Sequence, residues 1–109
     1  MIRAGDVLVV SFPGATGLKR RPVVAVSTDV YHATRPDIIV AVLTSQIASA
    51  TASTDYVLQD WDQAHLNRPT AFRAYLATVP AASVVAIGHL SARDWAEVRA
   101  RLRLALSVS

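Results

Sequence analysis

Two short polar clusters contain the side chains best suited to chemistry. Three consecutive cations, Lys19, Arg20 and Arg21, directly precede Pro22 and the apolar run that follows it. A second cluster, Thr44–Gln46, stands where another apolar run gives way abruptly to polar residues. A guanidinium group can donate to two phosphate oxygens at once, and a threonine hydroxyl can add a further hydrogen bond. If the fold brings them together, these residue types would suit binding of an anion such as a phosphate.

The proline after Arg21 bears on how firmly this charge is held. A residue that precedes proline is restricted to extended backbone, so Arg21 is aimed with little residual freedom. A second interpretation fits the spacing equally well, because charges at the edge of a sheet discourage pairing with another sheet. Spacing alone leaves an anion site and a protected sheet edge both open.

The elements that would position these clusters are short strands. Runs rich in Val, Ile and Ala predict strands at 6–12, 22–28, 37–43, 54–58, 70–78 and 83–90. The segments between them are predicted as loops at 13–21, 29–37 and 47–53, and as a turn of helix and a loop at 59–69. These connections are too short for helical crossovers, which favours an antiparallel, coiled sheet or a small barrel, and so a mainly β (α+β) fold. In an antiparallel hairpin the start of one strand lies beside the end of the next, so the two polar clusters are expected to meet.

The segment 90–106 carries the clearest helical pattern. Ser91 and Asp94 form an S-x-x-D capping pattern at its start. The apolar residues at helical spacing fall on one stripe, namely Trp95, Val98, Leu102 and Leu106. Its three arginines at 99, 101 and 103 lie elsewhere on the helix, where a solvated face is a simpler interpretation than a nucleic-acid-binding helix.

Composition narrows the class of protein. A chain of 109 residues with 52% apolar and 17% charged residues is expected to form one ordered domain, 1–109. Its net charge of +3 permits a polyanionic partner without demonstrating one. The chain has no cysteine, and its three histidines are far apart, so no metal site is expected.

Other signals that would indicate a different class of protein are missing from the sequence. Asp6 interrupts the first apolar run too early for an export signal, so 6–12 is expected to be a strand rather than a leader. No run of 18 apolar residues is present, which argues against a membrane span. There is also no G-x-S-x-G motif and no phosphate-binding loop ending in Gly-Lys-Ser/Thr.

The order of the motifs resembles the MazF/PemK family of toxin ribonucleases from toxin–antitoxin systems. The similarity spans nearly the whole chain and is carried by GDVLVVSFP, KRRPVVAVS, DIIVAVLTSQ and IGHLSARDWAEVRARLRLAL. It implies an SH3-like barrel of the MazF/CcdB type, a homodimer, and cytoplasmic, cofactor-independent and metal-independent cleavage of single-stranded RNA. It also implies a cognate MazE-like antitoxin as partner. Arg21 and Thr44 match the family's catalytic arginine and threonine.

The resemblance further implies a set of RNA-binding residues: Phe12, Lys19, Arg20, Ser45, Gln46 and Arg73. Phe12 is also well explained as a core or rim residue. The chain departs from many family members at Tyr75 and Ala77, which puts base preference rather than catalysis in doubt. Two other functions remain on the same fold: a gyrase-binding toxin of the CcdB type, and a barrel that binds a peptide or nucleic acid without catalysis.

Overall fold

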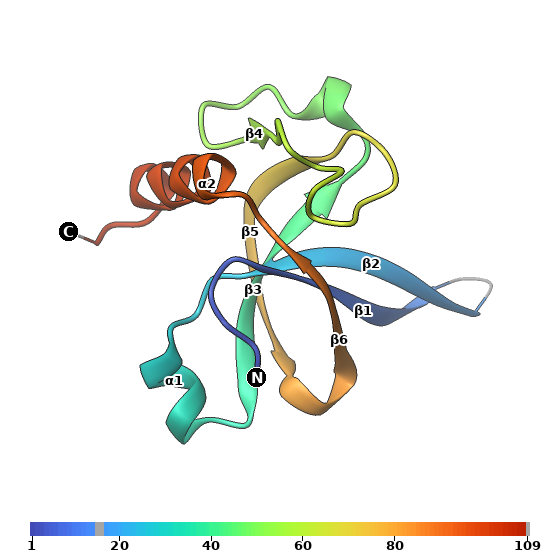
Figure 1. The fold of residues 1–109 in the computed structure, drawn as a ribbon, viewed down its shortest axis with the longest axis vertical. Helices are drawn as coiled ribbons and strands as arrows, with labels where there is room; N and C mark the ends of the chain where they lie inside the picture. The colour runs from blue at the N-terminus through green and yellow to red at the C-terminus, as the bar shows by residue number, and fades with distance from the viewer. Residues whose placement is uncertain (15–16, 109) are drawn as a thin grey trace.

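Strands in one curled sheet make up most of the molecule. The computed structural model describes residues 1–14 and 17–108. Within them, six antiparallel strands follow the order β4-β5-β3-β2-β1-β6, and the C-terminal helix α2 packs beside the sheet (Figure 1). This half-barrel with a helix confirms the predicted fold class. No helix in the described part of the chain combines the length and the apolar composition that crossing a membrane requires.

The first hairpin is longer than the sequence pattern predicted. β1 (Asp6–Gly14) pairs with β2 (Gly17–Ala25) from the pair Val7–Val24 out to the pair Gly14–Gly17. The prediction of a loop over 13–21 is therefore wrong in its described parts, because the ladder continues beyond the apolar residues. The three cations consequently lie on a strand, where successive side chains point to opposite faces.

The remaining strands extend the sheet from the first hairpin to its two edges. β3 (Asp37–Thr44) lies between β2 and β5 (Ala71–Pro80). β4 (Tyr56–Val57) pairs with β5 at one edge, and β6 (Val84–His89) pairs with β1 at the other. The fourth predicted strand is thus shortened to two residues, and 59–69 forms turns instead of the predicted turn of helix. Single 3₁₀ turns, η1 (Ile47–Ser49) and η2 (Ala81–Ser83), complete the connections.

One predicted loop is a helix in the structure. α1 (Asp29–Thr34) occupies most of 29–37, which the sequence pattern assigned to a loop. Thr28 caps the helix by accepting a hydrogen bond from the Tyr31 amide, and Asp29 adds a negative charge to the first turn. Arg35, which precedes a proline, takes an extended conformation and ends the helix.

Alternating side chains of the strands build a core on each face of the sheet. Val7 and Val24 belong to the cluster that α2 covers, whereas Leu8 and Val23 belong to the cluster on the opposite face. Phe72 and Val98 are fully buried in the first cluster. The sheet therefore needs apolar residues on both faces, which explains the near-continuous apolar runs of the sequence.

Asp94 ties α2 (Ala92–Ala105) to the segment before β5. Ser91 caps the helix as predicted, accepting from the Asp94 amide at 3.2 Å. The fully buried Asp94 carboxylate accepts from the Tyr56 hydroxyl at 2.6 Å and from the amides of Gln59 and Asp60 at 3.0 and 2.8 Å. The side chain that the capping pattern assigned to the helix end thus also fixes residues 59 and 60.

Replacing Asp94 with alanine is expected to lower the free energy of unfolding by about 3 kcal/mol, because several donors lose their buried acceptor. Urea denaturation followed by circular dichroism measures this change. The exposed Asp62 offers a matched control, and Asp62→Ala is expected to stay within about 0.5 kcal/mol of wild type. An Asp94→Ala protein as stable as Asp62→Ala would contradict this role.

Asp60 adds an acid-sensitive link to the same helix end. Its carboxylate accepts two hydrogen bonds of 2.7 Å from Arg93 and one of 2.6 Å from Ser91. The Arg93 and Ser91 hydrogen bonds lower the pKa of Asp60 to about 2. A carboxyl whose pKa is lower in the folded than in the unfolded chain stabilises the fold above its unfolded pKa, and this contribution disappears as the pH falls toward the folded pKa.

The difference in unfolding midpoint between wild type and Asp60→Asn is therefore expected to shrink as the pH falls from about 4 to about 2. Urea titrations at a series of pH values measure it. A difference that stays constant over this range would show that the Asp60–Arg93 pair does not act through the Asp60 charge.

Candidate functional site

The pairing of β2 with β3 brings the two polar clusters together. Paired residues run from Ala25–Val40 to Val23–Val42. Arg21 lies two residues before Val23 on β2, and Thr44 lies two residues after Val42 on β3. Side chains two residues apart on a strand point to the same face, so both belong on the face of Val23 and Val42.

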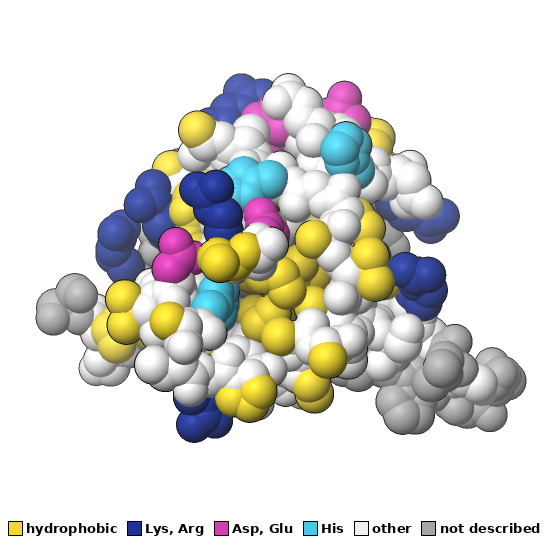
Figure 2. Space-filling view, turned by 60° about the horizontal axis from the view of Figure 1, so that its bottom comes forward, with side chains coloured by type: hydrophobic (Ala, Val, Ile, Leu, Met, Phe, Trp, Pro, Cys, Tyr) yellow, Lys and Arg dark blue, Asp and Glu magenta, His cyan; other side chains and the backbone are white. Residues whose placement is uncertain are grey.

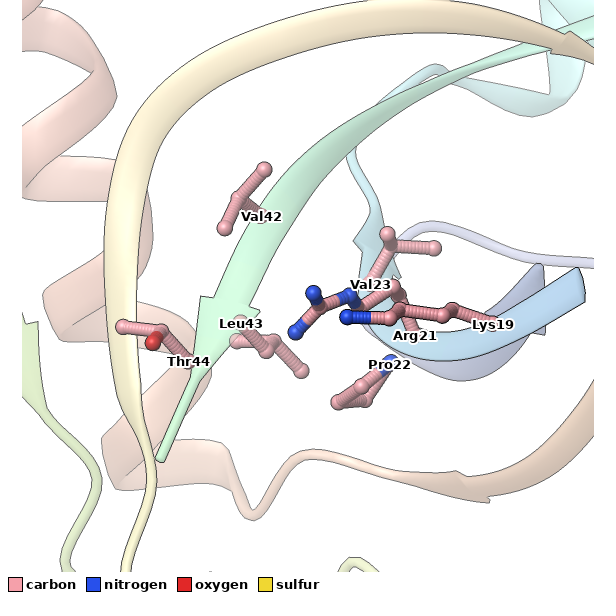
Figure 3. Close-up of a pocket in the computed structure, with 7 residues that line it drawn as sticks. All are labelled: Lys19, Arg21, Pro22, Val23, Val42, Leu43 and Thr44. Carbon is pink, nitrogen blue, oxygen red and sulfur yellow. The ribbon is translucent and has the colours of Figure 1, made fainter. Parts of the chain in front are cut away.

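Arg21 and Thr44 line one open hollow of about 310 Å³. Its wall comprises Lys19, Arg21, Pro22, Val23, Val42, Leu43 and Thr44. Figure 3 shows the long side chains of Lys19 and Arg21 extending from β2 toward β3. Leu43 and Thr44 are the last two residues of β3. The hollow therefore combines two cations with a hydroxyl above an apolar floor.

A second hollow of about 250 Å³ continues from the first and shares Arg21, Pro22, Leu43 and Thr44 with it. The new members of its wall are Arg20, Ser45, Leu66, Asn67, Arg68 and Thr70. Residues 66–70 belong to the connection between β4 and β5, so this connection closes the site from a third side. The two hollows therefore adjoin each other, and we call the two together the groove.

The hydroxyl of Thr44 is oriented by the turn that follows it. Its Oγ1 accepts a hydrogen bond of 3.1 Å from the Gln46 amide. A hydroxyl that accepts in this way keeps its own hydrogen for another acceptor. Thr44 is half-buried and stands at the end of β3, so its hydrogen is available to an anion in the groove.

The cations of the groove are not neutralised within the described residues. Among those residues, no carboxylate forms an ion pair with Lys19, Arg20, Arg21 or Arg68. The groove thus carries a local positive charge that suits a polyanionic ligand.

Two of the predicted binding residues lie outside the groove. Arg73 pairs with the buried Asp55 at 3.6 Å and lines a separate hollow with the exposed Tyr75. Gln46 contributes its backbone: the amide orients Thr44, and the carbonyl accepts from the Ser49 hydroxyl at 2.9 Å. The side chain of Phe12 lies outside the described residues. Lys19, Arg20 and Ser45, the other residues predicted to bind RNA, line the groove.

Residues 65–68 are part of the site but were missed in the sequence. His65, Leu66, Asn67 and Arg68 form part of the groove or of the hollow that adjoins it. In the sequence they read as an ordinary polar loop before Pro69, and no motif marks them. Their position depends on contacts with β6, which are distant along the chain: the His65 ring contacts the Ile87 carbonyl at 2.7 Å.

The acidic and histidine side chains are scattered over the molecule, one face of which is shown in Figure 2. Within residues 1–14 and 17–108, His, Asp and Glu form no group of three or more that could hold a metal ion. The groove itself is lined by cations and by the hydroxyl groups of Thr44, Ser45 and Thr70.

Solved structures with a similar fold include toxins and toxin–antitoxin complexes. A MazE–MazF structure (Form-II) from Deinococcus radiodurans matches with a TM-score of 0.75 at 22% identity, covering 98% of this chain and 96% of that one. An endoribonuclease in complex with its cognate antitoxin from a mycobacterial species gives 0.79 at 16% identity, covering 100% and 97%. Mycobacterium tuberculosis toxin MazF-mt6 gives 0.73 at 18% identity, covering 95% and 98%.

The likeness to these structures establishes a shared fold, and the family assignment comes from sequence. No curated protein sequence matches the chain significantly. The family model for PemK-like, MazF-like toxins of type II toxin–antitoxin systems matches residues 3–106, nearly the whole chain, and confirms the resemblance found in the motifs. The chain therefore belongs to the PemK-like, MazF-like toxin family.

Proposed function

We propose that this toxin is a metal-independent endoribonuclease that cleaves single-stranded messenger RNA in a sequence-specific manner and so inhibits translation and growth. The observation that carries the proposal is that Arg21 and Thr44, from neighbouring strands, line the same groove among further cations. A gyrase-binding toxin has no need of this pair.

The reaction uses a nucleophile that the RNA itself supplies. The 2′-hydroxyl oxygen attacks the adjacent phosphorus and loses its proton, the bond from phosphorus to the 5′ oxygen breaks, and the departing oxygen takes up a proton. The products are a 2′,3′-cyclic phosphate and a 5′-hydroxyl. The protein must hold the phosphate in line for attack and stabilise the charge that gathers on its oxygens.

Arg21 and Thr44 divide this work. The Arg21 guanidinium stabilises the charge on the phosphate oxygens, because a guanidinium keeps its proton and is poorly suited to act as a base. The Thr44 hydroxyl donates to a phosphate oxygen or orients the 2′-hydroxyl, since it accepts from the Gln46 amide and keeps its own hydrogen to donate. Lys19, Arg20 and Ser45 bind neighbouring parts of the RNA backbone.

The partners follow from the charge of the groove and from the family. We expect a cognate MazE-like antitoxin whose acidic, flexible segment lies in the groove and covers Arg21, because opposite charges attract it there. Solved relatives of this fold include a MazE–MazF structure. A homodimer acting in the cytoplasm, where messenger RNA is translated, completes the proposal.

Incubation of the purified chain with a defined single-stranded RNA in EDTA tests the function. The expected result is cleavage at a small number of sites, with cyclic phosphate on one product and a 5′-hydroxyl on the other. Intact RNA would contradict the proposal. A parallel supercoiling assay distinguishes the remaining alternatives, because inhibited gyrase would identify a gyrase-binding toxin and unaffected gyrase a non-catalytic barrel.

A further inference from the structure

A third hollow adjoins the groove on the face of the sheet that carries Val9. It has a volume of about 380 Å³. Its wall comprises Val9, Arg20, Pro22, His65, Leu66, Asn67 and Ile87. It shares Arg20, Pro22, Leu66 and Asn67 with the second hollow, so it adjoins the groove. We call it the side hollow.

The alternation of side chains along β2 connects the groove and the side hollow. Val9 pairs with Pro22 and Ser11 pairs with Arg20, so Pro22 and Arg20 face the side of Val9. Arg21, between them, faces the opposite side. A polyanion that places one phosphate at Arg21 can therefore run past Pro22 and place a neighbouring phosphate at Arg20 in the side hollow.

His65 has an unusual backbone conformation, and the turn before it is fixed by a close contact with β6. Its φ of 62° lies in the left-handed region, which non-glycine residues adopt rarely and which often marks a functional position. The turn before it lies directly on β6, because a Cβ added at Gly88 would come within 2.3 Å of the Ala64 carbonyl oxygen. Gly88 thus permits the close approach that fixes this turn.

The ring of His65 has a defined hydrogen-bonding pattern. Its Nδ1 lies 2.7 Å from the Ile87 carbonyl oxygen, and because a carbonyl can only accept, Nδ1 carries a proton. In the neutral ring, Nε2 is then an acceptor. The Asn67 amide in the same wall supplies both a donor and an acceptor. Val9, Leu66 and Ile87 supply apolar surface for a flat ring.

We propose that the side hollow binds one unstacked base of the RNA, next to the phosphate at Arg21, and that His65 and Asn67 select that base. His65 Nε2 accepts an N–H of the base edge, the Asn67 amide pairs with the neighbouring group, and Arg20 binds the adjoining phosphate. Specific readers of single-stranded RNA bind splayed bases in this way, by contact with apolar or aromatic surface and by hydrogen bonds to base edges. The inference rests on the proposed ribonuclease function and assigns it two specificity-determining residues.

The test compares base preference at every position around the cleavage site, using an RNA library with randomised positions. Wild type is expected to prefer one base at a position adjacent to the cleaved phosphate. Asn67→Ala and His65→Phe are each expected to lower that preference by about tenfold or more, since a good pair of base contacts discriminates at this level. Preference at the other positions should stay unchanged, which a general loss of folding would not produce.

Gln63→Ala is the matched control, because Gln63 is exposed in the same connection and is absent from the wall of the hollow. It should retain the full preference. A preference that is unchanged in either Asn67→Ala or His65→Phe would overturn the inference while leaving the nuclease in place.

A second readout separates the inference from the nuclease function. Binding of 2′-O-methyl oligonucleotides that differ in one base can be measured without cleavage, because the nucleophile is blocked. Equal affinity of wild type for all four bases at every position overturns the inference. A preference that is present in wild type and lost in both variants supports it, even if wild type fails to cleave RNA.

Discussion

Replacing Arg21 with alanine is expected to lower the rate of RNA cleavage by a factor on the order of 10²–10³, the usual cost of losing one preorganised donor in an active site. The physical reason is that charge accumulates on the phosphate oxygens during attack, and alanine leaves the cation-lined hollow without its guanidinium at that point. A single-turnover assay on a defined RNA, at saturating protein, measures the chemical step separately from binding.

Arg103→Ala is the matched control for this variant. Arg103 is exposed in the last turn of α2 and does not line the groove, so its removal deletes the same charge elsewhere. Its cleavage rate should stay close to wild type. Arg21→Lys keeps the charge but loses the two-pronged donor, and should fall between alanine and wild type. Full activity of Arg21→Ala would remove Arg21 from the mechanism.

The second large effect is expected for Thr44→Val, which keeps the shape of the side chain and removes its hydroxyl. We expect a loss of about 10²–10³ in the single-turnover rate, because the donor to the phosphate is lost. The turn held by the Gln46 amide also loses its acceptor, so circular dichroism and thermal unfolding should accompany the rate measurement.

Thr44→Ser separates the two roles of this residue. It restores the hydroxyl and the acceptor for the Gln46 amide, and should recover most of the rate. Thr78→Val, at an exposed position of β5, is the matched control and should behave as wild type. A valine variant that cleaves as fast as the serine variant would show that the hydroxyl has no part in the reaction.

The sequence pattern was sufficient to predict those elements that depend on interactions between residues close together in the chain. The β-branched runs revealed β1 and β3, and the Ser91 cap with its apolar stripe revealed α2. The meeting of Arg21 with Thr44 followed from the rule that consecutive antiparallel strands place the start of one beside the end of the other. The structure places both residues in one wall, in agreement with that rule.

Features that depend on contacts between residues far apart in the chain could not be predicted from the sequence. The outer part of β2 was not recognised as a strand because its residues are polar. This part of the strand is stabilised by pairing with β1 and not by apolar residues of its own. His65 lies where Gly88 and the Ile87 carbonyl hold it, more than twenty residues away in the chain. Arg73 forms an ion pair with Asp55. It lies opposite Val42, directly after the register shift of β3 against β5, which the sequence does not indicate.

The most direct test of the account is the cleavage rate of the double variant Arg21→Ala, Thr44→Val, measured beside both single variants on one RNA in EDTA. Two side chains that act on the same phosphate should give strongly non-additive losses, with the double variant only slightly slower than the slower single variant. Losses that multiply, or single variants that retain the wild-type rate, would contradict a shared phosphate at Arg21 and Thr44.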